Sequence, residues 1–256
     1  MRRLFSLLYG GVVYLAFLAV FLYAIAFVGG FAVPKTVDSG ASASMGVAVA
    51  IDLCLLLLFA VQHSVMARPW FKERWTEVVP KHLERSTYVL AATAVLALMM
   101  WAWRPIPEIV WSVEGTGATV LWGIFAAGWA VVLISTFLID HFDLFGLKQV
   151  WARFRERDYR YPEFQTPAFY QYVRHPLYLG FLMAFWAIPE MTAGHLLFAA
   201  ATTGYILVAV RFEERDLIRY HGQAYARYRE RVPMILPWRG EAAGGPQAEE
   251  VPEAAG

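Results

Sequence analysis

Residues 115–139 read GTGATVLWGIFAAGWAVVLISTFLI, 25 consecutive residues without one charged side chain. A helix needs about 20 apolar residues to cross the roughly 30 Å hydrocarbon core of a bilayer. This stretch is long enough to do so, and it predicts a transmembrane helix.

Three similar stretches precede it, at residues 7–33, 45–67 and 86–103, and the only charged side chain in them is Asp52. Each of these stretches also predicts a span. The sequence therefore contains four clear spans in its first 139 residues.

Two further apolar stretches follow, at 177–189 and 191–210, and Pro189 and Glu190 interrupt the chain between them. The first would form a helix of only about 20 Å, which is too short to span alone. We interpret the two as a helical hairpin. The predicted fold is an all-α, polytopic membrane bundle of four spans plus this C-terminal hairpin.

The basic residues predict which side of the membrane each loop occupies. Loops 1–6, 67–85, 140–176 and 211–256 together hold 20 of the 22 Lys and Arg residues. The positive-inside rule places these loops, and both termini, in the cytoplasm. We expect an integral protein of a bacterial inner membrane.

The composition excludes several classes of protein. The chain is 59% hydrophobic with a net charge of +1, so it has no field that would attract nucleic acid. Its single cysteine, Cys54, excludes a disulfide scaffold.

Residues 1–239 are expected to form one membrane domain. Residues 240–256 lack aromatic side chains and are expected to form a disordered tail.

Placing an ionisable side chain within the membrane costs free energy, so each such residue is a candidate for a functional role. Asp52 lies deep in the second span, and His63 lies eleven residues later on the same helical face. Asp140 and His141 end the fourth span. The alternatives are a buried helix–helix contact for Asp52, an interfacial histidine for His63 and a solvated helix end for the last two.

Arg174, His175 and Glu213 belong to the same predicted membrane level as His63 and His141. Their convergence is typical of a pocket open to the cytoplasm, although the polar rim of a bundle has the same composition. We predict no metal site, because the histidines form no HExxH motif or close pair. Haem ligation by His63 and His141 remains an alternative.

Two blocks of sequence carry a family pattern. The first is TPAFYQYVRHPLYLG at 166–180, and the second combines EERDL at 213–217 with GQAYARYRERVP at 222–233. Together they resemble the isoprenylcysteine carboxyl methyltransferase superfamily of membrane methyltransferases, over about residues 140–238. QHSVMARPWFK at 62–72 and LIDHFDLFGLKQV at 138–150 are more similar to its branch of NnrU proteins and methanethiol S-methyltransferases.

The resemblance implies S-adenosylmethionine as methyl donor, bound between the hairpin and the C-terminal segment. It places cofactor contacts in the segment from Pro162 to Gln165 and at further positions that match the family's motifs. The individual residues implied are Phe164, Gln165, Tyr170, Arg174, His175, Pro176, Leu177, Tyr178 and Glu213. A carboxylate such as Glu213 suits a ligand that carries an ammonium and a sulfonium.

The chain departs from the carboxyl methyltransferases at Ala209, where they place an arginine that serves the prenylcysteine substrate. This departure favours a small acceptor without a carboxylate. The expected reaction is S-methylation of methanethiol, a volatile thiol, to dimethyl sulfide. The alternatives are another thiol or a prenylcysteine carboxylate as acceptor, or an NnrU-like membrane protein of nitrogen-oxide metabolism.

A thiol is mostly protonated at neutral pH, so the transfer calls for a base. His141 and His63 are the candidate bases, with Asp52 or Asp140 as orienting or alternative groups.

Overall fold

The computed structural model describes residues 1–160 and 164–237, and it confirms the all-α prediction. Within these residues, five helices are long and apolar enough to cross a membrane: α1 (Arg2–Gly29), α2 (Met45–Ala67), α4 (Lys81–Ala102), α5 (Gly115–Ile139) and α9 (Ala193–His221). A shorter apolar helix, α8 (Pro176–Trp186), precedes α9 and forms the predicted hairpin with it. The tail predicted at 240–256 lies outside the described residues.

Several short elements connect the long helices. They are α3 (Pro69–Trp75), α6 (His141–Leu144), α7 (Leu147–Phe154), a 3₁₀ turn (Ala168–Gln171), α10 (Gln223–Arg231), and the strands β1 (Ile109–Ser112) and β2 (Glu190–Thr192). The two strands pair antiparallel, with Ile109 opposite Thr192 and Ser112 opposite Glu190.

Local sequence explains where the helices of the hairpin begin and end. Pro176 occupies the first turn of α8, where its missing N–H costs no hydrogen bond. The hydroxyl of Thr192 caps α9 by accepting from the His195 N–H at 3.0 Å. Helix α9 continues eleven residues beyond the predicted end at Val210, until Gly222 adopts a positive φ of 55°. It therefore carries both Glu213 and Glu214.

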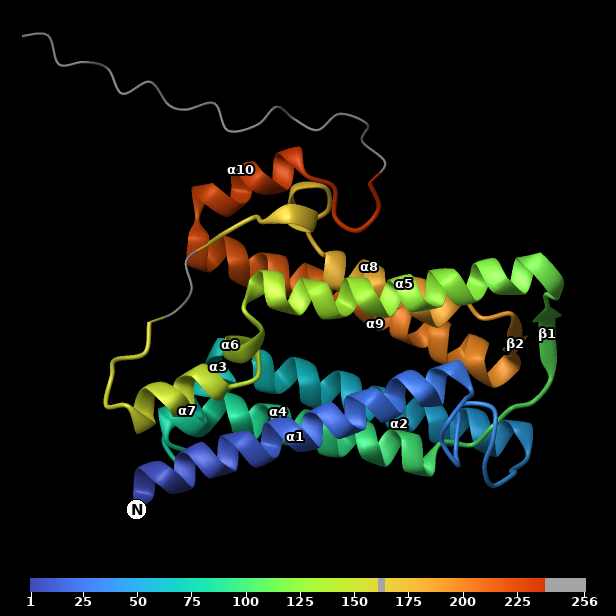
Figure 1. Cartoon of the computed structure of the whole chain (residues 1–256), viewed down its shortest axis with the longest axis horizontal. Helices are drawn as coiled ribbons and strands as arrows, with labels where there is room; N and C mark the ends of the chain where they lie inside the picture. Colours follow the sequence, from blue (N-terminus) through green and yellow to red (C-terminus); the bar gives the residue numbers. More distant parts are fainter. Residues whose placement is uncertain (161–163, 238–256) are drawn as a thin grey trace, which may run out of the picture.

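The helices form two groups, with α1, α2, α4 and the short α7 below and α5, α8, α9 and the short α10 above (Figure 1). The N-terminus, α3, α6 and α7 lie at one end of the molecule, which we call the basic end. The strands β1 and β2 lie at the opposite end, which we call the strand end (Figure 1). Helix α7 follows α5 in the chain but packs on α1 and α4, so the segment from 140 onward connects the two groups at the basic end.

Helix α8 packs antiparallel along α5 through two glycines. A Cβ added to Gly180 would lie 2.6 Å from the carbonyl oxygen of Gly128, and one added to Gly128 would lie 2.7 Å from that of Gly180. The 11 residues of α8 cover only about 16 Å. The chain nevertheless reaches the strand end, because residues 187–192 continue from α8 into β2, which pairs with β1 just before α5.

The strand end is closed by buried contacts. Trp103 is fully buried and its indole N–H donates to the Val37 carbonyl at 3.0 Å. The Trp111 indole N–H donates to the Ile188 carbonyl at 3.2 Å. Leu15, Leu22 and Phe137, in contrast, are more than half exposed on long apolar helices and lie outside the cavity, as expected for side chains that face lipid.

Candidate active site

A cavity of about 1820 Å³ lies between the two groups of helices. Lys81, Arg153 and His221 line it at the basic end, and Met99 and Phe198 line it nearer the strand end. Typical small-molecule pockets measure roughly 300–1,000 Å³, so this cavity has room for more than one small ligand.

Most of the residues selected from the sequence line this cavity. They are His63, His141, Phe164, Gln165, Tyr170, Arg174, His175, Leu177, Tyr178 and Glu213. Three others, Asp52, Asp140 and Pro176, are not among its lining residues. Pro162, expected at the start of the cofactor segment, lies outside the described residues.

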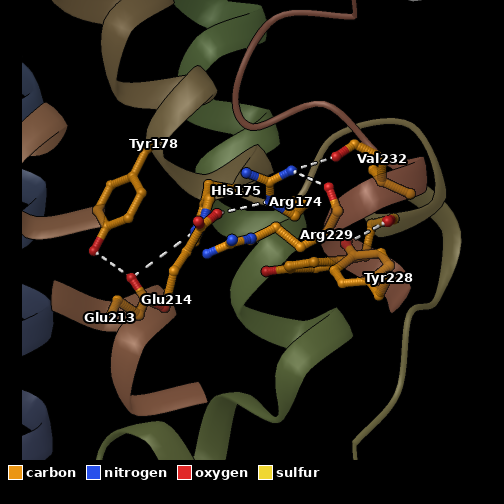
Figure 2. Close-up of polar contacts among 9 residues, drawn as sticks. Arg174, His175, Tyr178, Glu213, Glu214, Tyr228, Arg229 and Val232 are labelled. Atoms are coloured by element: carbon orange, nitrogen blue, oxygen red, sulfur yellow. Dashed lines mark hydrogen bonds and ion pairs between the residues drawn. The ribbon is translucent and has the colours of Figure 1, made fainter. Parts of the chain in front are cut away.

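Glu214 organises the polar end of the cavity, whereas the cofactor contact predicted from the sequence is its neighbour Glu213. Its Oε1 accepts from Arg174 Nε at 2.7 Å and lies 3.1 Å from His175 Nε2 (Figure 2). Both partners directly precede α8, and the side chains of Arg174 and Glu214 are each 10% exposed. The pair ties the beginning of α8 to the outer turns of α9.

The same arginine fixes the last turn of α10 and the segment after it. Arg174 Nη1 donates to the carbonyls of Arg229 at 2.9 Å and Val232 at 2.5 Å (Figure 2). The backbone N–H groups of Arg174 and His175 donate to the carbonyls of Pro233 and Met234. The RHP block and the RVP block of the sequence therefore contact each other directly, and Arg174 holds them together.

Glu213 is differently placed. Its Oε2 accepts from the Tyr178 hydroxyl at 2.9 Å and lies 3.9 Å from His175 Nδ1 (Figure 2). Its side chain is 43% exposed and lines the cavity, unlike that of Glu214. Glu213 thus presents its carboxylate to the cavity while Tyr178 fixes its orientation.

Aromatic side chains from two segments form one wall beside these carboxylates. The ring of Phe164 lies 5.7 Å from that of Tyr225 and 5.6 Å from that of Tyr228. The Tyr228 hydroxyl donates to the Tyr170 carbonyl at 2.6 Å. We call Phe164, Tyr170, Tyr225 and Tyr228 the aromatic wall.

Two hydroxyls of the aromatic wall, those of Tyr170 and Tyr225, are buried without a hydrogen-bond partner among the described residues. Burial raises the pKa of both phenols, so both remain protonated and able to donate. Buried polar groups normally have partners, and both of these line the cavity. They fit a ligand that combines a flat ring with hydrogen-bond acceptors, as the adenosine part of S-adenosylmethionine does.

His63 faces the cavity from the opposite group of helices. Its ring stacks on Phe59 at 5.2 Å between centroids. The Tyr88 hydroxyl lies 3.1 Å from its Nδ1 and 3.0 Å from its Nε2. The same hydroxyl donates to the His63 carbonyl at 3.4 Å. Its oxygen can therefore accept the N–H of one ring nitrogen, which leaves the lone pair of the other nitrogen facing the cavity.

His141, in contrast, is occupied at both ring nitrogens. The Thr136 hydroxyl donates to the Leu133 carbonyl, so at 2.8 Å its oxygen accepts from His141 Nδ1. The His141 Nε2 then accepts from the Tyr14 hydroxyl at 2.8 Å. Burial lowers the pKa of His141, although nearby Asp140 acts in the opposite direction. The ring is a neutral link between α1, α5 and α6.

The two aspartates outside the cavity have structural contacts. Asp52 is fully buried and accepts from the Arg104 N–H at 2.9 Å, so it fastens α2 to the chain after α4. Asp140 caps α6 by accepting from the Asp143 N–H and pairs with Lys148. In the described ranges, no three His, Cys, Asp or Glu side chains converge as a metal site would require.

Comparison with known proteins identifies the family of this chain. The sequence profile of the NnrU protein family matches residues 53–232. The methanethiol S-methyltransferase of Mycobacterium tuberculosis is 54% identical over 93% of this chain and 98% of its own length. The methanethiol S-methyltransferase of Crocosphaera subtropica is 50% identical, over 94% of this chain and 95% of its own.

A third relative, methanethiol S-methyltransferase 2 of Bradyrhizobium diazoefficiens, is 54% identical over 92% of this chain and 91% of its own length. No solved structure is significantly similar to the chain. The family profile, the coverage of these relatives and the contact between the RHP and RVP blocks lead to one conclusion: the chain belongs to the NnrU family of membrane proteins, together with the methanethiol S-methyltransferases.

Proposed function

We propose that this protein transfers a methyl group from S-adenosylmethionine to the sulfur of methanethiol and forms dimethyl sulfide. The observation that carries the proposal is the placement of Glu213 and the aromatic wall at the polar end of a large cavity, with His63 lining the same cavity. Relatives about half identical over nearly the whole chain are named for this reaction. The basic end of the molecule faces the cytoplasm, by the distribution of Lys and Arg.

The residues present suit the cofactor. Glu213 balances its positive charge, and Tyr178 keeps the carboxylate in place. The aromatic wall takes the adenine, and the hydroxyls of Tyr170 and Tyr225 donate to it or to the ribose. Gln165 and the opening of α8 at Leu177 line the same space. When bound, S-adenosylmethionine supplies an electrophilic methyl group on a sulfonium.

The protein's own contribution is to align two sulfur atoms and accept a proton. Apolar side chains of α2, α4 and α9 exclude water from the inner part of the cavity. His63 takes the thiol proton, because Tyr88 donates to the His63 carbonyl and leaves one ring nitrogen with a free lone pair, while both nitrogens of His141 are engaged. Tyr88 orients the His63 ring, and His141 maintains the packing of α6.

The proposal is tested with purified protein in lipid nanodiscs. Methanethiol and S-adenosylmethionine are added, and dimethyl sulfide is measured in the headspace by gas chromatography. We expect one dimethyl sulfide for each S-adenosylhomocysteine formed. Protein that binds the cofactor but forms no dimethyl sulfide would refute the proposed acceptor.

A further inference from the structure

The inner part of the cavity has a composition that methanethiol does not require. From the level of Tyr88 and Glu213 toward the strand end, the described residues that line the cavity include no charged side chain. We call this part the shaft and define it by Leu56, Ala92, Leu96, Met99, Phe198 and Ala201, which come from α2, α4 and α9.

The shaft is also long. Eleven residues of α4 separate Tyr88 from Met99, which is about 16 Å along the helix. Fifteen residues of α9 separate Glu213 from Phe198, which is about 22 Å. Both Met99 and Phe198 line the cavity, so it continues well past the level at which His63 and Tyr178 meet a substrate. An acceptor with a single methyl group fills little of this length.

We propose that the protein also methylates thiols that carry a linear alkyl chain, with the sulfur beside His63 and the chain in the shaft. This inference rests on the proposed function and extends its substrate class. Apolar side chains on three helices surround a chain of this kind as they would a lipid, and its burial is favourable because apolar surface leaves water.

The reaction is balanced in the same way as for methanethiol. His63 accepts the proton of the thiol, and the sulfur forms a bond to the methyl carbon. The bond between that carbon and the sulfonium sulfur breaks, and its electron pair stays on the cofactor. The products are a methyl alkyl sulfide, S-adenosylhomocysteine and a proton that His63 releases to water.

The test compares octanethiol with methanethiol in the nanodisc preparation, with each methyl sulfide identified by mass spectrometry. We expect kcat/KM for octanethiol to equal or exceed that for methanethiol, because the longer chain buries more apolar surface. Turnover of methanethiol without turnover of octanethiol overturns this inference alone. Turnover of neither thiol overturns the proposed function as well.

Variants show whether the chain occupies the shaft. Ala92→Phe and Ala201→Phe each fill it from a different helix, and we expect each to lower the octanethiol to methanethiol ratio of kcat/KM at least tenfold. Ala94→Phe is the matched control, because Ala94 lies on the exposed side of α4, outside the cavity lining. An unchanged ratio in both shaft variants shows that the chain binds elsewhere and refutes the assignment.

Discussion

Glu213 and Glu214 are neighbours in the chain, yet they face different partners. Glu214 turns to Arg174 and His175 and is almost entirely buried, whereas Glu213 turns to Tyr178 and the cavity (Figure 2). One carboxylate therefore holds the site together, and the other is available to a ligand.

Substitution should separate these two roles. We expect Glu214→Gln to lower the free energy of unfolding by about 2 kcal/mol, since two charge-assisted hydrogen bonds lose their ionised acceptor. Glu213→Gln should leave stability nearly unchanged and weaken S-adenosylmethionine binding by about ten- to a hundredfold. Thermal unfolding and calorimetric titration measure the two quantities. If the two substitutions had equal effects on stability and on cofactor affinity, the assignment would be contradicted.

The aromatic wall offers a second comparison. Tyr170→Phe and Tyr225→Phe each remove a hydroxyl without a protein partner, so we expect unchanged stability and roughly fivefold weaker cofactor binding, about 1 kcal/mol. Tyr228→Phe is the control, because its hydroxyl already donates to the Tyr170 carbonyl. That variant should instead lose about 1 kcal/mol of stability. Cofactor affinity unaffected by either of the first two changes would refute the placement of the cofactor.

The glycine contact between α5 and α8 predicts a packing defect. Gly180→Ala places a methyl group 2.6 Å from the Gly128 carbonyl oxygen, and backbone cannot move aside as a side chain can. We expect a loss of about 1–3 kcal/mol in thermal unfolding. Gly123 lies on α5, as Gly128 does, but a Cβ added there would meet nothing within 4 Å. Gly123→Ala should therefore be neutral or slightly stabilising. A wild-type melting temperature for Gly180→Ala would disprove the close approach.

The two histidines should differ in their effect on turnover. His63→Ala removes the proposed base, and we expect kcat to fall by about 10²- to 10⁴-fold while the cofactor binds as before. His141→Gln preserves a donor and an acceptor and should retain most of the activity. Stopped-flow turnover and cofactor titration distinguish the cases. Full turnover by His63→Ala would assign the proton to another acceptor.

His141 also predicts a dependence of stability on pH. Its pKa is lowered in the folded protein, so the unfolded chain binds a proton first as pH falls below about 6.5. The contribution of His141 to stability is therefore complete above that pH and is lost as pH falls toward the folded pKa. Between pH 7.5 and 5.5, the melting temperature of wild type should fall more than that of His141→Gln. Parallel curves would show that His141 does not titrate differently on folding.

Much of the fold could be predicted from the sequence, because absence of charge over a bilayer's thickness leaves few alternatives. The bounds predicted at 45–67 and 115–139 coincide with α2 and α5. The pairing of β1 with β2 could not be predicted, because each strand is only three or four residues long and its partner lies about 80 residues away.

The site was harder to predict in detail. Glu213 and Glu214 differ only in which way α9 is rotated against α8, and a single sequence carries no information about that rotation. The role of His141 depends on Tyr14, 127 residues away in the chain. In both cases the missing information was tertiary packing.

The contact between Gly128 and Gly180 also bears on how this family can diversify. Backbone meets backbone there, so positions 128 and 180 tolerate no larger side chain, and the two helices that form this wall of the cavity are held at a fixed distance. The opposite walls, from α2 and α4, carry side chains such as Leu56 and Leu96 whose size can vary without moving a helix. We expect descendants that adopt new acceptors to have changed α2 and α4 first and to have kept α5 and α8 nearly constant.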